Sequence, residues 1–373
     1  MSNKIVKEFA SSESNFIEDI IDGMQDWVRV IDRDGKVLFV NKPMREGLGY
    51  DAVGRKCFEV LGRSSPCPNC ISSLRGENLP NSKEEAINGR VFSVTSSPLK
   101  SFQSNNVEAV IEVLHDITEL KVLSQELERQ NEQLKEDLSM ARKLQCSLLP
   151  KQQSVGEKIS FSYIYKPCEM IGGDFLDIFE IDEDHVGIYI ADVSGHGVAA
   201  SMLTMFLRAA IDKSSLSPSK VLTQLYHEFN KNGFEDELYI SVFYGIINIS
   251  DYSFSYSNAG LNVSPILFSG EDFKLLRTRG IPISNWVDNP EYTEVTQKLN
   301  PKDRLLFYTD GIIEIKNKSS EQFGEDRIVE HFLRKDLKPS SIISKLVDKA
   351  LSFSGSSMHD IMDDITVALL EMK

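Results

Sequence analysis

Apolar and polar positions alternate through the first third of the chain, which is the pattern of strands with one buried face. The segment WVRVIDRDGKVLFVN, which starts at Trp27, alternates on both sides of Asp34-Gly35, a pair suited to a tight hairpin turn. GRVFSVTSSPLK and VEAVIEVLHDITEL repeat the alternation and are joined by the polar loop SFQSNN. We predict an antiparallel sheet with short helices between its two halves.

The pattern then becomes helical. Residues 120–148 contain neither proline nor glycine, are dense in good helix formers, and are followed by Pro150, which ends the helix. A heptad stripe runs along them, with Leu120, Leu127, Leu134, Ala141 and Leu148 at d positions and Ser124, Asn131, Leu138 and Gln145 at a positions. We predict one long helix in a parallel coiled coil, in which a buried Asn131 favours two strands in register. The alternative is a single solvated linker helix.

Beyond Pro150, strand-like apolar segments mostly follow one another. The expected strands lie near FSYIYKP, HVGIYIADV, LYISVFYGIINI, FSYSNAG, DRLLFYTDGI and DITVALLEM, and the expected helices follow Gly197 and lie around residues 218–230 and 339–352. Because helices do not alternate regularly with strands, this order favours an antiparallel α+β sandwich over a doubly wound parallel sheet.

Composition adds limits on location and partners. A chain of 373 residues, 41% of them hydrophobic, is long enough for two compact domains. Its formal charge of −15 would repel a nucleic-acid backbone or an anionic membrane, so neither is expected as a partner. No apolar run approaches the roughly 20 residues of a membrane span, and the start MSNKIVKEFASSESN lacks the apolar core of a signal peptide. We expect a cytoplasmic protein.

Three of the five cysteines lie close together in the sequence. Cys57 precedes a C-x2-C pair, Cys67 and Cys70, by ten residues. Without a fourth cysteine or a nearby histidine, a closed zinc site is incomplete. A structural role, a redox-responsive role and an iron–sulfur role all stay open, and disulfides are not expected in the cytoplasm.

Aspartates at strand ends are the candidates for chemistry. Each lies beside an apolar strand: Asp174 in IGGDF, Asp192 in IADVSGHG, Asp310 in FYTDGI, and Asp363 with Asp364 in MDDITV. Converging carboxylates repel, and a hard divalent cation holds them together. Because no cysteine or histidine accompanies them at zinc-like spacing, we expect magnesium or manganese. Two such ions generate a nucleophile and clamp a phosphoryl group, which predicts phosphate ester hydrolysis.

Several motifs together carry a family resemblance. IGGDFLDIF, IADVSGHGVAASMLTMFLRAAI, YSNAGLNVSPIL, DRLLFYTDGIIEIKN, FGEDR and DDITVALLEM occur in the order and approximate spacing of the SpoIIE-type branch of PPM serine/threonine protein phosphatases. Near the N-terminus, VIDRDGKVLFVNKPM, GLGYDAVGRKCFEVL and HDITEL together resemble a PAS sensor domain.

The resemblance implies a set of metal ligands and an architecture. Matched residue by residue, the ligands of two manganese or magnesium ions are Asp174, Asp192, the Val193 carbonyl, Asp310 and Asp363. Asp364 is expected to point away, because neighbouring side chains on a strand face opposite sides. His196, between two glycines, is expected to be structural rather than a general acid. The implied architecture is α+β: a PAS domain over residues 14–119, a coiled-coil linker over 120–149 and a PPM-type α-β-β-α sandwich over 150–373.

Two segments depart from the family pattern. NAGLNVSPIL has leucine and asparagine where the family often shows a histidine followed by prolines, and GIPISNW lacks the usual second glycine. We expect both to lie away from the ligands and to affect which substrate fits.

The functional expectation is a homodimeric, sensor-controlled phosphatase. The resemblance implies that its substrate is a phosphorylated STAS-domain anti-anti-sigma factor in a partner-switching pathway. A nucleotide cyclase is disfavoured because no partner motif for nucleotide binding follows GGDF. A histidine kinase fails because the linker has no histidine after His115. The remaining alternative is a non-catalytic phosphoprotein-binding regulator of the same fold.

Overall fold

The computed structural model describes residues 13–67, 70, 82–100, 107–151, 158–332, 338–355 and 363–373. The chain divides into two compact units, Met1–Gln133 and Leu134–Lys373. Helix α5 (Thr118–Leu148) contributes to both, so residues 134–148 of the expected linker belong to the second unit. The expected domain ranges otherwise stay predictions, and the SFQSNN loop lies outside the described residues.

The first unit is built on one antiparallel sheet of five strands, in the order β2-β1-β5-β4-β3. Its strands are β1 (Trp27–Asp32), β2 (Val37–Val40), β3 (Ser82–Ile87), β4 (Arg90–Lys100) and β5 (Val107–Asp116), and its helices before α5 are α2 (Glu13–Asp22), α3 (Lys42–Leu48) and α4 (Cys57–Val60). The predicted hairpin is confirmed, since β1 pairs with β2 around Gly35, which adopts a φ of 74°. The predicted antiparallel sheet with short helices between its halves is confirmed as well.

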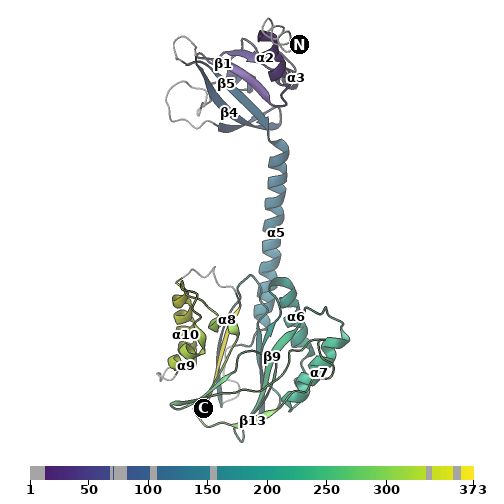
Figure 1. Ribbon diagram of the computed structural model, residues 1–373, viewed down its shortest axis with the longest axis vertical. Helices are drawn as coiled ribbons and strands as arrows, with labels where there is room; N and C mark the ends of the chain where they lie inside the picture. The colour runs from purple at the N-terminus through teal and green to yellow at the C-terminus, as the bar shows by residue number, and fades with distance from the viewer. Residues whose placement is uncertain are drawn as a thin grey trace, which may run out of the picture. The chain divides into compact units, whose positions relative to one another are not determined.

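The second unit contains two antiparallel sheets of five strands each (Figure 1). One has the order β13-β10-β9-β8-β7, with β7 (Phe175–Glu180), β8 (His185–Val193), β9 (Ile240–Asn248), β10 (Ser253–Ala259) and β13 (Val295–Lys298). The other has the order β12-β11-β14-β15-β6, with β6 (Ile159–Lys166), β11 (Ile266–Ser269), β12 (Asp272–Leu275), β14 (Arg304–Tyr308) and β15 (Ile365–Met372).

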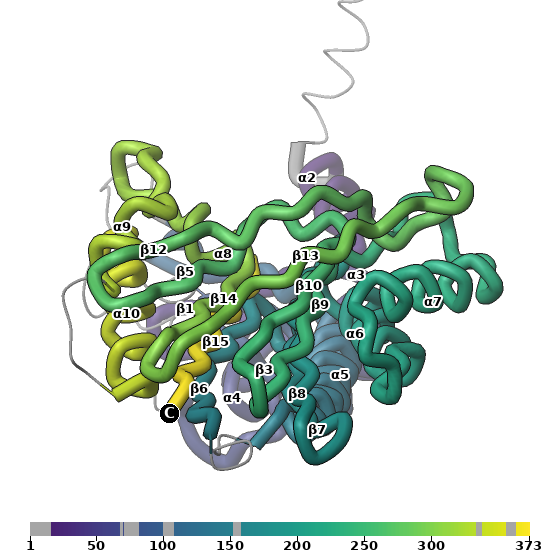
Figure 2. The backbone as a smooth tube through the Cα atoms, turned by 90° about the horizontal axis from the view of Figure 1, so that it is seen from below, coloured from purple at the N-terminus to yellow at the C-terminus, as the bar shows by residue number. Residues whose placement is uncertain are grey.

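Helices cover the outer faces of these two sheets. Figure 2 shows α6 (Gly197–Ala210) and α7 (Pro218–Lys231) on one side of the strands, and α9 (Gly324–Phe332) and α10 (Pro339–Ser354) on the other. A short helix, α8 (Asp310–Ile313), follows β14. The sheets share one hydrophobic core, in which the ring of Phe307 from β14 lies 6.0 Å from that of Phe243 on β9. The predicted antiparallel α+β sandwich is therefore confirmed.

Helix α5 confirms the predicted long helix, but two of its predicted coiled-coil positions, Gln145 and Leu148, pack into the second unit. Leu120, Leu127 and Leu134 are more than half exposed, as seam residues are before a partner covers them. Gln145, which was expected at heptad position a of the seam, is only 2% exposed. That expectation is wrong, because the Gln145 amide is hydrogen-bonded inside the second unit. In the part of the chain that the structure describes, no helix has the length and apolar character of a membrane span.

Candidate metal centre

The loop before β7 carries the first candidate ligand directly after two glycines, Gly172 and Gly173, that pack closely against their neighbours. A Cβ on Gly172 would lie 2.3 Å from Asp364 Oδ2, and one on Gly173 would lie 3.0 Å from the Val193 carbonyl oxygen. The glycine pair therefore brings the loop into contact with two of the segments that carry candidate ligands.

Asp174, next in the loop, is almost fully buried and is oriented by two hydroxyls. Its Oδ2 accepts hydrogen bonds from Thr309 Oγ1 at 2.7 Å and Thr366 Oγ1 at 2.6 Å. Burial raises the pKa of Asp174 well above its usual range, the Asp192 and Asp364 charges add to the rise, and the two hydroxyls oppose it. Sequence reasoning missed both threonines, which meet because β14 and β15 are neighbours.

The next candidate ligands, Asp192 and Asp363, come from different strands of the sandwich. Asp192 lies near the end of β8, and burial together with the charges of Asp310, Asp363 and Asp364 raises its pKa to about 8. Asp363 precedes β15 with its side chain still open to solvent; partial desolvation together with Asp310 and other carboxylates raises its pKa to about 6, against a backbone hydrogen bond that lowers it. These aspartates thus lie within electrostatic range of one another, as the sequence predicted.

Asp310 begins α8 and has a partner that we did not expect. Asn262 Nδ2 donates a hydrogen bond to Asp310 Oδ2 at 2.7 Å. The expectation that NAGLNVSPIL lies away from the ligands is therefore wrong for Asn262. The loop after β10 carries Asn262 to the end of β14, where Asp310 lies. Strand patterns in the sequence do not reveal that these two segments are close. Gly311 packs tightly here, since a Cβ would lie 1.9 Å from the Asp364 carbonyl oxygen.

Asp364 holds the backbone of the glycine loop. Its Oδ1 accepts from the Cys168 amide at 2.8 Å, and its Oδ2 accepts from the amides of Gly173 at 2.6 Å and Asp174 at 3.2 Å. Asp364 is buried, whereas Asp363 is exposed. Alternation along the strand thus gives the two neighbours different surroundings, as expected, and the anchoring role of Asp364 was missed.

His196 lies in the glycine turn before α6. Gly195 and Gly197 adopt φ values of 83° and 74°, which glycine tolerates best. The imidazole is exposed, and its Nδ1 lies 2.8 Å from Glu169 Oε1. This contact joins the turn after β8 to the loop that carries Asp174, which is compatible with the structural role expected for His196.

The carboxylates match a divalent cation by their donor chemistry. Within the described ranges, no three His, Cys, Asp or Glu side chains form a group that could hold an ion as they stand. The donors that converge are hard carboxylate oxygens, which magnesium and manganese prefer. Burial and the repulsion of neighbouring carboxylates both raise the pKa of Asp192, and a cation between the carboxylates would relieve that repulsion. The residues present therefore fit the expected metals.

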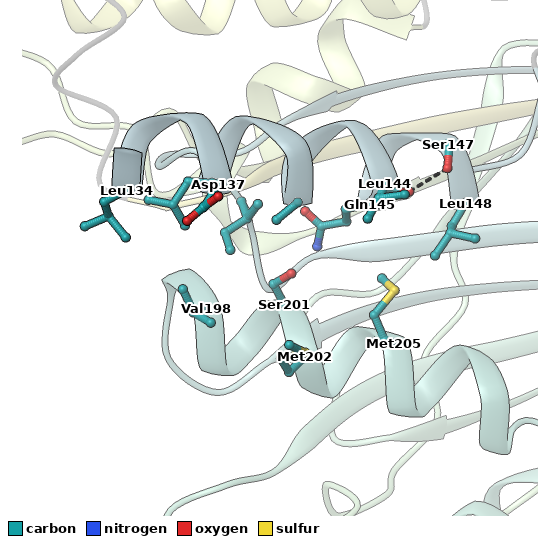
Figure 3. A pocket seen from close by; sticks show the side chains of 13 residues that line it. Leu134, Asp137, Leu144, Gln145, Ser147, Leu148, Val198, Ser201, Met202 and Met205 are labelled. Atoms are coloured by element: carbon teal, nitrogen blue, oxygen red, sulfur yellow. Dashed lines mark hydrogen bonds between the residues drawn. The ribbon is translucent and has the colours of Figure 1, made fainter. Parts of the chain in front are cut away.

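The end of α5 contacts the same glycine loop from its other side. Gln145 Nε2 donates to the Gly172 carbonyl at 2.8 Å, and its Oε1 accepts from Tyr165 Oη at 3.2 Å and from the Gly172 amide at 3.3 Å. Figure 3 shows Gln145 pointing from α5 toward α6. An apolar groove of about 510 Å³ lies between these helices, lined by Leu144, Val198 and Met202 among others.

Comparison with family models gives two matches. Residues 182–373 match the model of Stage II sporulation protein E (SpoIIE), which is more than half of the chain. Residues 15–80 match a PAS domain model. The two resemblances drawn from sequence motifs are thus confirmed.

Curated proteins and solved structures give further similarities. The chain is 28% identical over 249 residues to phosphoserine phosphatase RsbP of Bacillus subtilis, covering 64% of this chain and 58% of RsbP. It is 24% identical to phosphoserine phosphatase RsbU of the same organism, covering 65% of this chain and 72% of RsbU. The fold is similar to the SiaA-PP2C domain of Pseudomonas aeruginosa, with a TM-score of 0.58, 21% identity and coverage of 65% of this chain and 99% of that domain.

Proposed function

The chain belongs to the SpoIIE family, and from this we propose that its second unit is a metal-dependent phosphatase that acts on phosphoserine or phosphothreonine in a partner protein. The observation that carries the proposal is the convergence of Asp192, Asp310 and Asp363 from separate segments: Asp310 and Asp363 lie close enough to add to the rise in the pKa of Asp192, and Asp310 adds to that of Asp363. A cluster with this much repulsion costs stability unless it holds cations.

We assign the ligand roles to Asp174, Asp192, Asp310, Asp363 and the Val193 carbonyl, with two manganese or magnesium ions. When bound, such ions supply an activated water and neutralise charge on the phosphoryl oxygens. The chain's own residues fix the geometry. Thr309 and Thr366 orient Asp174, Asn262 orients Asp310, and Asp364 holds the glycine loop in place.

The proposed substrate is a phosphorylated STAS-domain anti-anti-sigma factor in a partner-switching pathway. The similarity to two proteins named phosphoserine phosphatase supports the phosphoserine chemistry. The match covers only 58% of the length of RsbP. The activity, substrate and partners of this chain are therefore our proposals, and they rest on the residues of this chain. The strongly acidic chain makes nucleic acid an unfavourable partner. A cytoplasmic location stays a prediction.

We further propose that the PAS domain controls the phosphatase and that the chain is a homodimer joined through α5. The exposed d-position residues Leu120, Leu127 and Leu134 support this, because a partner helix would remove them from water. Ser124 and Asn131, both exposed, remain candidate a positions, and Gln145 is excluded from the seam.

The decisive experiment is phosphate release from a phosphoserine STAS protein by the purified full chain with manganese. We expect turnover that disappears on chelation and in the Asp192→Asn variant. The alternative, a non-catalytic phosphoprotein-binding regulator, predicts binding of the phosphorylated partner without phosphate release. A generic aryl phosphate is assayed in parallel. Its hydrolysis without that of the STAS protein would show that the enzyme is active and that the protein substrate was wrongly chosen.

A further inference from the structure

The first unit contains three cysteines, Cys57, Cys67 and Cys70, that have no part in the proposed phosphatase site. Cys57 begins α4 and packs, with Cys67, against the buried cluster that contains Trp27 and Phe92. All three are free thiols with partly exposed side chains. Burial raises the pKa of Cys57, and Cys67 and Cys70 are close enough to contribute to the rise. Three thiols therefore share one neighbourhood.

Cys67 differs from the other two in having a cation at its sulfur. Lys83 Nζ donates a hydrogen bond to Cys67 Sγ at 3.5 Å, and the Cys67 thiol donates one to Glu85 Oε1 at 3.9 Å. Glu85 also binds Lys83 at 2.7 Å and Arg63 at 2.5 Å. Two cations share one carboxylate, so the local charge beside the sulfur is positive. The sulfur thus has a cationic hydrogen-bond donor at contact distance in a partly exposed position, which is the kind of surrounding in which reactive cysteines are found.

The position of Lys83 is fixed by the sheet. Lys83 lies on β3 opposite Val94 of β4, and its side chain is only 16% exposed. An exposed lysine would spend little time near one sulfur. This one is held beside Cys67 by burial and by its ion pair with Glu85.

We propose that Cys67 is an oxidant-reactive thiol and Cys70 its resolving partner, so that the first unit is chemically modified by hydroperoxides. The Cys67 thiolate attacks one peroxide oxygen, the O–O bond breaks, and the leaving hydroxide or alkoxide takes a proton from solvent. Cys67 becomes a sulfenic acid. The Cys70 sulfur then attacks the Cys67 sulfur, the S–O bond breaks, and water leaves with the Cys70 proton. One peroxide is reduced and two thiols are oxidised to a disulfide.

Cys70 is the better partner than Cys57 for physical reasons. It lies three positions along the chain from Cys67, so only two residues separate the two cysteines in the sequence. Cys57 is packed against the core, and its raised pKa keeps the thiol protonated at neutral pH, which slows attack. Cys57 thus serves as the internal comparison.

The test treats the reduced full chain with hydrogen peroxide, quenches it and maps the thiols by mass spectrometry. We expect a Cys67–Cys70 disulfide in the parent and in Cys57→Ala. In Cys70→Ser, a dimedone-type probe should label Cys67 as the sulfenic acid. Cys67→Ser should show neither product. Lys83→Met should slow Cys67 oxidation by about tenfold, and Lys83→Arg should restore most of the rate.

Four results would overturn the proposal. The first two are equal oxidation rates for all three thiols and a Cys57–Cys67 disulfide in place of Cys67–Cys70. The third is a Lys83→Met variant that oxidises at the parental rate although its thermal unfolding shows a normal fold. The fourth is purified protein in which a bound zinc or iron ion protects the three thiols. The last would identify a metal site instead. None of these results depends on whether the second unit is a phosphatase.

Discussion

Asp363 and Asp364 are adjacent in the sequence but have opposite environments. Asp363 is exposed and belongs to the group of aspartates that repel one another. Asp364 is buried and accepts three backbone N–H bonds from the loop that carries Asp174. The same chemical change should therefore have different effects at Asp364 and at a candidate ligand.

The first prediction concerns the candidate ligands. Asp192→Asn and Asp310→Asn should each abolish manganese-dependent turnover, because each removes an anionic oxygen ligand. In the metal-free protein both variants should fold normally, and Asp192→Asn should unfold at the same or a higher temperature, because a charge leaves a crowded cluster. Phosphate release and thermal unfolding measure the two effects. Near-parental turnover of both variants at saturating manganese would reject the ligand assignment.

The second prediction concerns the anchor. Asp364→Asn should destabilise the metal-free protein by about 1–3 kcal/mol, because the new amide group faces backbone N–H donors and leaves at least one of them without an acceptor. Turnover should fall as the glycine loop loosens around Asp174. Urea unfolding of this variant beside Asp192→Asn is the measurement. If both substitutions shift the midpoint equally in the same direction, the separate roles assigned here are wrong.

The sequence pointed to the aspartates as candidate ligands but not to the side chains that contact them. Each candidate ligand lies beside an apolar strand inside a family motif, so pattern and resemblance both point to it. Thr309, Thr366 and Asn262 act through side-chain contacts between segments far apart in the chain. Those contacts depend on which strands become neighbours, and local residue patterns do not carry that information.

At the scale of elements, α5 shows how a correct helix prediction can assign a residue to the wrong face. The heptad stripe is exposed at Leu120, Leu127 and Leu134, but it also includes Gln145, whose amide makes three hydrogen bonds with the glycine loop and Tyr165. A seven-residue repeat indicates which positions share a face. It does not indicate where along the helix a solvent-facing stripe becomes a buried contact.

The strands of the second unit that the sequence did not predict are three short strands and one strand whose residues are mostly buried. β11, β12 and β13 have four residues each, too few to show an alternating pattern. In β7 the first four residues are buried, including Asp177, so no alternation appears. Asp177 is tolerated there because Lys213 Nζ lies 2.5 Å from its Oδ2. That lysine follows α6, so the pairing could not be read from the strand itself.

The third prediction tests the contact between α5 and the glycine loop. Gln145→Ala should weaken manganese-dependent turnover and destabilise the protein by about 1–3 kcal/mol, because buried donors and acceptors of Gly172 and Tyr165 lose their partner. Gln130→Ala is the matched control, since Gln130 is an exposed glutamine of the same helix whose amide donates to Glu126, one turn earlier on that helix. Equal turnover and equal unfolding temperature in the two variants would show that the Gln145 contact is incidental.

At the scale of the whole molecule, the order of strands was enough to predict the architecture. Strands following strands predicted an antiparallel sandwich, and the alternating N-terminal third predicted a separate sheet; both exist. The boundary was less readable, because α5 runs without a break from one compact unit into the other. A continuous helix shows no composition change at Leu134, where its contacts change from one unit to the next.

The last prediction concerns communication between the two units, which share α5 as a covalent connection. A coil with Ser124 and Asn131 at its a positions is weakly specified, so two arrangements of similar free energy are available for the sensor to bias. Replacing both with isoleucine should strengthen the dimer and fix one arrangement. Phosphatase activity should then stay constant across conditions that change the activity of the parent.

The control places isoleucine at Gln125 and Glu132, which are exposed and one position further along each heptad, outside the seam. Light scattering gives the oligomeric state, and manganese-dependent phosphate release gives the response. If the seam variant responds to the sensor as fully as the control does, α5 acts only as a tether, and control of the phosphatase must take another route.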